Sequence, residues 1–256
     1  MSIFSKKRIS GNAKRSLNSF ITVVAACAFL PVFSGACAGN KTGAAERSGV
    51  SEQSAAAVKA VVHNPGDAVT DWKVALQYLK DGNKRYIEDR TMTRNTNAAD
   101  RAVLKSGQKP FAVIITCADS RVSPEIYFDQ KLGDIFVIRN AGNIAAPSVL
   151  GSIEYAVEHL HSPLVVVVGH SSCGAVGGAF AATEHDGEQE HPENLQTILN
   201  TIIPVIANSG TVDEGIHANV AHVVERIKEN KVVEHVGATV IGAYYNIESG
   251  EVSFKQ

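Results

Sequence analysis

Four short segments of the chain are almost purely apolar and rich in β-branched residues, namely 111–116, 135–138, 164–169 and 238–245. Strands that carry apolar side chains on both faces are buried on both faces, as in a parallel sheet covered by helices. A fifth segment, 252–254, follows a turn-forming sequence and is expected to add an antiparallel edge. The pattern therefore predicts an α/β fold with a mostly parallel sheet of four or five strands.

Helices are predicted on both sides of this sheet. Apolar positions recur at helical spacing over 148–159, 173–183, 194–207 and 214–229. Residues 71–86 show a similar spacing, interrupted by Gly82 and Asn83, and predict an amphipathic N-terminal helical arm. Such an arm needs a surface to pack on, which favours an oligomer.

The first 38 residues have the layout of an export signal. Five basic residues and no acidic ones fall within 1–36, and the mostly apolar run 20–33 is followed by small residues. Cleavage before Gly39, acylation of Cys27 or Cys37 as in a lipoprotein, and an uncleaved anchor are the alternatives. We expect an exported protein, periplasmic or membrane-anchored and facing outside the cytoplasm, with any membrane contact confined to this segment.

The rest of the chain divides into a tether and one folded domain. Residues 39–66 lack periodic apolar positions and predict a flexible tether, and residues 67–256 form the expected catalytic domain. Without the five basic residues of 1–36, the chain carries 19 basic and 26 acidic residues, a net charge of −7. This balance argues against nucleic acid as a partner of the mature protein.

Reactive side chains follow two of the predicted strands. Cys117, Asp119 and Arg121 come at the end of the first strand, and His170 and Cys173 follow the third. Ligands of open α/β sheets bind beyond the carboxyl ends of the strands, where these residues would meet. Two cysteines and a histidine suit Zn²⁺ and leave a fourth position, for water in a catalytic site or for Asp119 in a closed one.

Two plainer interpretations compete with a metal site. Two cysteines in an exported protein commonly form a disulfide, here between Cys117 and Cys173. Asp119 and Arg121 alone could form a surface ion pair worth about 0–1 kcal/mol. The positions of both cysteines at the ends of buried strands, with His170 three residues before the second, favour the metal.

Together these motifs resemble those of the β-class carbonic anhydrases. Cys-x-Asp-x-Arg at 117–121 is followed by Phe-Val-Ile-Arg-Asn-Ala-Gly-Asn at 136–143 and His-x-x-Cys at 170–173, and the likeness runs from about residue 79 to residue 246. The resemblance implies one Zn²⁺ per chain, with the ligands Cys117, His170 and Cys173. It makes Asp119 and Arg121 the catalytic pair, with Asp119 as a fourth ligand if the site is closed.

The resemblance also implies an activity and an assembly. The expected reaction is the reversible hydration of carbon dioxide to bicarbonate and a proton by zinc-bound hydroxide, in a homodimer or homotetramer. Phe136, Tyr155 and Gly174 match the substrate pocket, and Gln130 resembles a glutamine that hydrogen-bonds the substrate across a dimer interface. Ile114 stands where the family's bicarbonate-inhibited branch has tryptophan, which implies the branch with an open site.

Two other functions share the same residues. An enzyme that hydrolyses carbonyl sulfide or carbon disulfide would use the same ligands and the same nucleophile. A noncatalytic zinc module would have Asp119 closing the site permanently.

Overall fold

The structure is a computed structural model that describes residues 63, 67–92, 97–184 and 191–255. All of them belong to one compact unit, Ala56–Gln256. The predicted export signal and all of the predicted tether except His63 lie outside the described residues. Within the described part, no helix is both long enough and apolar enough to cross a membrane.

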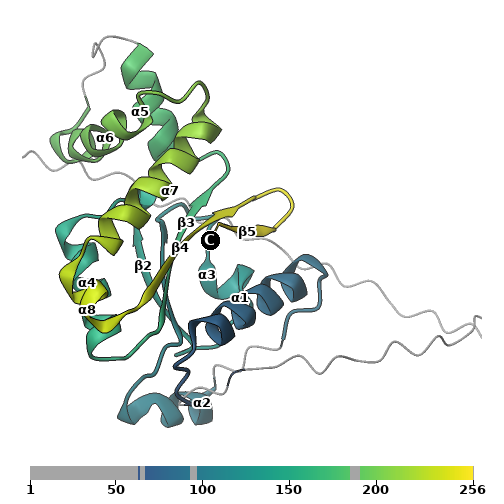
Figure 1. Cartoon of the computed structure of the whole chain (residues 1–256). Helices are drawn as coiled ribbons and strands as arrows, with labels where there is room; N and C mark the ends of the chain where they lie inside the picture. Colours follow the sequence, from purple (N-terminus) through teal and green to yellow (C-terminus); the bar gives the residue numbers. More distant parts are fainter. Residues whose placement is uncertain (1–62, 64–66, 93–96, 185–190, 256) are drawn as a thin grey trace, which may run out of the picture. The chain divides into compact units, whose positions relative to one another are not determined.

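A five-stranded sheet forms the centre of the fold (Figure 1), with the order β2-β1-β3-β4-β5. The four parallel strands are β1 (Ala112–Cys117), β2 (Ile135–Asn140), β3 (Leu164–His170) and β4 (Thr239–Tyr245). The last strand, β5 (Val252–Lys255), pairs with β4 in the antiparallel direction. The α/β fold predicted from the apolar segments is therefore confirmed, including the antiparallel edge.

Helices and short helical turns connect the strands. The longer helices are α1 (Trp72–Ile87), α4 (Pro147–Glu158), α5 (Gly174–Glu184), α6 (Glu193–Ile206) and α7 (Val212–Lys228). Three short helices and two 3₁₀ turns complete the described part: α2 (Ala98–Val103), α3 (Pro124–Tyr127), α8 (Lys231–Val236), η1 (Leu104–Ser106) and η2 (Ala141–Asn143). All five long helices were expected from apolar spacing, whereas the short ones were not.

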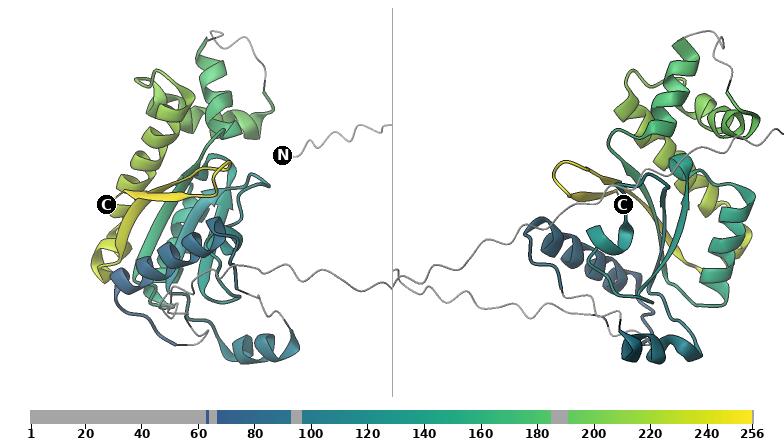
Figure 2. Two further views of the ribbon diagram at one scale, coloured as in Figure 1. Left: turned by 90° about the vertical axis from the view of Figure 1, so that its right-hand side faces the viewer. Right: turned by 180° about the vertical axis from the view of Figure 1, so that it is seen from behind.

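The sheet lies between two helical layers (Figure 2). Alternate residues along each strand face opposite sides, so Ile114 and Val166 pack in the core that includes α1 residues. Ile115 and Val167 pack on the other face with residues of α4, α7 and α8. A third buried cluster includes Cys117 and residues of α5, α6 and α7, so these helices cover the carboxyl end of the sheet.

The N-terminal arm packs on its own chain. Gly82 lies so close to the carbonyl oxygen of Phe128 that a side chain would have no room there. The Asn83 Nδ2 atom donates to the carbonyl oxygens of Tyr127 (2.9 Å) and Gly250 (2.8 Å), and its Oδ1 atom accepts from the Val252 amide (2.8 Å). The arm therefore does not need a partner subunit to cover its buried face, which removes this particular reason to expect an oligomer.

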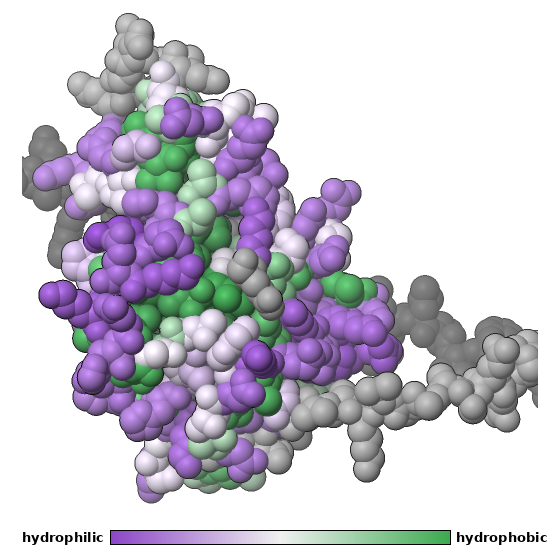
Figure 3. Space-filling model, in the orientation of Figure 1, coloured by the Kyte–Doolittle hydropathy of each residue, from purple (hydrophilic) through white to green (hydrophobic). Residues whose placement is uncertain are grey.

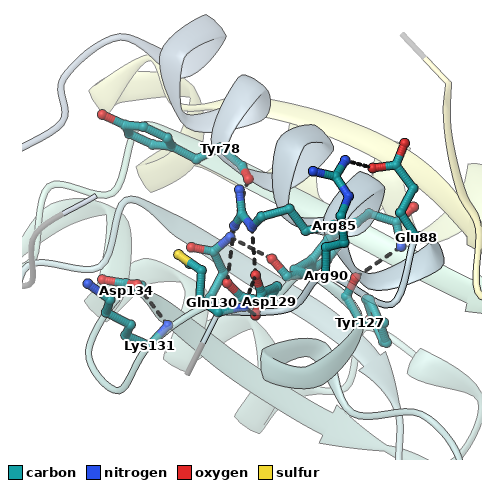
Figure 4. Close-up of polar contacts among 12 residues, drawn as sticks. Tyr78, Arg85, Glu88, Arg90, Tyr127, Asp129, Gln130, Lys131 and Asp134 are labelled. Atoms are coloured by element: carbon teal, nitrogen blue, oxygen red, sulfur yellow. Dashed lines mark hydrogen bonds and ion pairs between the residues drawn. The ribbon is translucent and has the colours of Figure 1, made fainter. Parts of the chain in front are cut away.

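A buried ion pair fixes the end of the same helix (Figure 4). Arg85 Nε lies 2.6 Å from Asp129 Oδ2, and the Asp129 residue is fully buried. Asp129 Oδ2 also accepts from the backbone amide of Met92, which follows the helix, at 3.0 Å. The segment after α3 is therefore bonded both to α1 and to the chain that follows α1.

Candidate metal centre

Three potential metal ligands meet at the carboxyl ends of β1 and β3. Cys117 is the last residue of β1, His170 is the last residue of β3, and Cys173 follows in the loop before α5. One ligand atom from each lies within 4.8 Å of the others, and the two Sγ atoms are 4.0 Å apart. All three residues are buried, with His170 fully inaccessible to solvent. The parallel strands thus bring together residues that are 53 positions apart in the sequence.

The two sulfur atoms have different proton affinities. The neighbouring Cys173 thiol lowers the pKa of Cys117 to about 4, against the effect of burial, and the nearby His170 ring and the amides of Gly142 and Asp119 contribute. The adjacent Cys117 sulfur and burial raise the pKa of Cys173. The site therefore already favours one thiolate, the form in which cysteine binds metals.

His170 presents an unpaired ring nitrogen to the site. Its Nδ1 atom lies 3.0 Å from the backbone oxygen of Ser171, to which it donates in the neutral ring. Its Nε2 atom is buried and has no hydrogen-bond partner. A metal-binding histidine commonly uses one nitrogen for the metal and bonds a carbonyl with the other.

The residues of this cluster fit Zn²⁺. Two sulfurs and one imidazole nitrogen are ligands that Zn²⁺ prefers, and the unpaired Nε2 of His170 supplies the nitrogen. Among the described residues, no other histidine, cysteine or acidic residue joins the group. Three protein ligands are the number found in catalytic zinc sites, which keep a fourth position open.

The Asp119 carboxylate is held beside the cluster by Arg121. Arg121 Nε donates to Oδ1 at 3.0 Å, Nη2 donates to Oδ2 at 2.7 Å, and the Arg121 amide also donates to Oδ1. The Arg121 side chain holds the pKa of Asp119 well below its usual range. Arg121 Nη2 also lies 3.2 Å from the Ser172 carbonyl oxygen, so this side chain connects both ligand-bearing loops.

The chain is similar in sequence and in structure to known proteins of one family. A family model for carbonic anhydrase matches residues 112–252. A carbonic anhydrase from Mycolicibacterium smegmatis is 37% identical over 198 residues, which cover 73% of this chain and 93% of that protein. A crystal structure of a β-carbonic anhydrase from Aspergillus fumigatus has a TM-score of 0.55 at 25% identity and covers 72% of this chain and 90% of the other. The chain belongs to the β-class carbonic anhydrase family.

Two more members of the family show how far the likeness extends. The chain is 54% identical over 114 residues to carbonic anhydrase 2 of Mycobacterium tuberculosis, and this match covers 44% of the chain and 53% of the relative. The chain thus spans about half the length of this relative. A crystal structure described as one of two tetrameric β-carbonic anhydrases from Sordaria macrospora has a TM-score of 0.55 at 25% identity and covers 72% of this chain and 94% of the other.

The residues that the resemblance to β-class carbonic anhydrases assigns to the substrate pocket lie in different parts of the fold. The ring centroids of Phe136 and Tyr155 are 6.3 Å apart, and Tyr155 is 47% exposed on α4. Gly174 is the first residue of α5 and follows Cys173 directly. Gly174 therefore lies beside the ligands, whereas Phe136 pairs with Val113, four residues before Cys117, and so lies away from the ligands of its own chain together with Tyr155. Contact of these three residues with substrate stays a prediction.

The Gln130 side chain is buried within its own chain. Its residue is 4% exposed, and its Nε2 atom donates to the carbonyl oxygens of Phe128 (2.6 Å) and Tyr78 (3.2 Å). Figure 4 shows this amide beside the arm helix of its own chain. Both amide hydrogens are used within one subunit, and donation to a substrate across a dimer interface stays a prediction.

The loop beside the ligands contains contacts that the sequence did not reveal. Arg139 donates from Nε to the Cys117 carbonyl oxygen (3.1 Å) and from Nη2 to the Asp119 carbonyl oxygen (2.7 Å). The Gly142 amide lies 3.4 Å from Cys117 Sγ, and Asn219 Nδ2 lies 2.8 Å from the Gly142 carbonyl oxygen. The only signal for Asn219 is a single polar residue on the apolar face of the helix predicted over 214–229.

Proposed function

We propose that this chain catalyses the reversible hydration of carbon dioxide to bicarbonate and a proton, with one Zn²⁺ held by Cys117, His170 and Cys173. The observation that carries the proposal is the buried Cys-His-Cys cluster with the Arg121-bound carboxylate of Asp119 beside it. When bound, Zn²⁺ lowers the pKa of a coordinated water to about 7 and so supplies a nucleophile near neutral pH.

Asp119 and Arg121 orient the nucleophile. The Asp119 carboxylate is ionised at neutral pH, and Arg121 lowers its pKa further. It can therefore accept a hydrogen bond from the attacking water and direct the oxygen lone pair at the substrate carbon. Arg121 fixes both carboxylate oxygens and the Ser172 carbonyl, which holds Asp119 away from the ligand cluster and supports an open site.

An apolar substrate suits the rings that the resemblance assigns to the pocket. In its own chain, Phe136 pairs with Val113, four residues before Cys117 on β1, and so lies away from the ligands. Phe136 and Tyr155 offer ring surfaces, and Gly174 leaves the mouth of the loop without a side chain. Carbon dioxide has no charge to bind, so an apolar wall suits it. We propose these three residues for the pocket on the strength of the resemblance, and Gln130 stays a predicted pocket residue.

The decisive experiment compares two substrates on one zinc-loaded preparation. Stopped-flow hydration of carbon dioxide and hydrolysis of carbonyl sulfide would be measured in parallel, with zinc quantified. The proposal predicts fast hydration and little sulfide release. Fast hydrolysis of carbonyl sulfide with slow hydration would assign the site to the sulfur substrate instead, and one zinc per chain without either activity would indicate a noncatalytic module.

We infer that the active protein is a homodimer or homotetramer. Among the described strands β2 forms an unpaired edge, and its residues Ile135–Ile138 are only partly buried. Apolar surface also gathers on the face shown in Figure 3, and Tyr155 and Leu132 are about half exposed. Apolar edge strands are usually covered. Analytical ultracentrifugation would test this, and a monomer at micromolar concentration would contradict it.

We also propose that the protein is exported, with residues 1–38 as signal peptide or lipoprotein signal, 39–66 as tether and 67–256 as catalytic domain. The support is the basic and apolar pattern of the first 38 residues. Cell fractionation and the mass of the mature N-terminal peptide would test it. A cytoplasmic protein that retains residues 1–38 would contradict export.

A further inference from the structure

We propose that Asn219 is a positioning residue of the metal centre, which acts on the Cys117 sulfur through the backbone of Gly142. The inference rests on the proposed zinc site and does not depend on which substrate that site converts. Asn219 belongs to α7 and lies far in sequence from all three ligands. Its role would be to hold a backbone N–H at the ligand sulfur.

Two hydrogen bonds in series connect Asn219 to the sulfur. Asn219 Nδ2 donates to the Gly142 carbonyl oxygen at 2.8 Å, and the Gly142 amide donates to Cys117 Sγ at 3.4 Å. Gly142 thus accepts on one side and donates on the other. Fixing its carbonyl restrains the orientation of the whole residue, including the amide that faces the sulfur.

The conformation and surroundings of Gly142 leave no room for a side chain. Its φ of 70° is in the left-handed region. A Cβ atom would lie 2.7 Å from Ile202 Cδ1 and 3.1 Å from Ala175 Cβ, closer than packed carbon atoms come. The backbone therefore packs tightly against α5 and α6, and the Asn219 amide is a buried side-chain donor to its carbonyl oxygen.

Asn219 is a buried polar residue on an apolar helix face, so its amide needs a hydrogen-bond partner inside the protein. The residue is 2% exposed, and its neighbours Ile216, Val220 and Val223 on α7 are apolar and buried. A buried amide is costly unless it is hydrogen-bonded. Its Nδ2 atom meets that requirement at Gly142, a residue whose amide donates to the Cys117 sulfur.

An N–H donated to a metal thiolate withdraws electron density from the sulfur and orients it. Such outer contacts change metal affinity by roughly 10–100-fold when they are removed. They also change the energy of the sulfur-to-metal charge-transfer band when the site holds Co²⁺. A contact that only stabilises the fold would leave that band where it is.

The test uses the full chain loaded with Co²⁺ and then with Zn²⁺. Asn219→Leu keeps the approximate volume of the side chain and removes the donor. Asn219→Ala also removes the donor, without overpacking, and serves as the test if the leucine variant does not fold. Val223→Ala, a buried position one turn further along the same helix, is the matched control for loss of packing. Co²⁺ spectra and competition with a chelator would be recorded for each protein.

We expect both Asn219 variants to shift the charge-transfer band and to bind Zn²⁺ about 10–100-fold more weakly, with Val223→Ala like the wild type in both. Folded Asn219 variants with a wild-type band and affinity would overturn the inference. A wild-type protein that binds metal normally but hydrates no carbon dioxide would refute the proposed function and leave this inference standing. A wild-type chain that binds no metal at Cys117 would refute both.

Discussion

Arg121 binds both oxygens of the Asp119 carboxylate, with Nε 3.0 Å from Oδ1 and Nη2 2.7 Å from Oδ2. A paired guanidinium and carboxylate of this kind is more directional than a single contact. Because the same Arg121 Nη2 atom reaches the Ser172 carbonyl oxygen, the pair is anchored to the loop that carries Cys173. This geometry distinguishes it from a free surface ion pair.

Replacing Asp119 should separate catalysis from metal binding. Asp119→Asn keeps the size of the side chain but loses its charge, so we expect the rate of carbon dioxide hydration to fall by about 10²-fold or more. Zinc should stay near one per chain, because the three ligands are unchanged. Stopped-flow assays with zinc analysis would measure both.

Asp81→Asn, on the arm helix and away from the ligands, is the control for loss of a carboxylate and should keep its activity. A fully active Asp119→Asn protein would show that the catalytic assignment of Asp119 is wrong.

The buried pair of His63 and Asp134 makes a prediction about pH and stability. His63 Nδ1 lies 2.8 Å from Asp134 Oδ1, and Nε2 lies 3.0 Å from the Asp67 carbonyl oxygen. Burial works to lower the pKa of His63, but the hydrogen bonds to Asp134 and Asp67 and the charges of both carboxylates raise it overall above 6.5. A raised pKa means that folding favours the protonated ring.

The stabilisation by His63 should therefore be complete below the unfolded pKa of 6.5 and lost as the pH rises through the folded pKa. We expect His63→Gln to reduce the free energy of unfolding more at pH 5 than at pH 9. Urea denaturation of both proteins at the two pH values measures this difference. An equal loss at both, or a larger one at pH 9, would contradict the account.

Asn83 should be important for stability and not for chemistry. Its side chain makes three hydrogen bonds that join α1 to the end of α3 and to the turn before β5. Asn83→Leu leaves buried backbone groups unpaired and should cost about 2–4 kcal/mol in the free energy of unfolding. Asn200→Leu, at an exposed position of α6, should change stability by less than about 0.5 kcal/mol. Urea denaturation would rank the two, and similar losses would contradict the role given to Asn83.

The parts of the fold that could be predicted are those that depend on burial and strand order. The apolar runs around Ile114 and Val166 required a sheet covered on both faces, and that sheet brought Cys117 and His170 to one edge. Gly82 and Asn83 interrupt the apolar spacing of the predicted arm, and α1 continues through both. The missing side chain of Gly82 allows close approach to Phe128, and Asn83 bonds other elements.

Contacts that depend on side-chain orientation could not be predicted. Gln130 is turned into its own subunit by two backbone carbonyls, which no spacing in the sequence specifies. Asn219 meets Gly142 only because α7 crosses the loop after β2. Short helices such as α3, with four residues, are too short to show a period.

The most direct test of the central claim is a cycle of metal removal and return on the full chain, with hydration of carbon dioxide and zinc content followed together. The account predicts about one zinc per chain, loss of activity on chelation and recovery when Zn²⁺ is restored, with Cys173→Ser failing to retain the metal. Activity that survives complete zinc removal, or full zinc binding by Cys173→Ser, would contradict it.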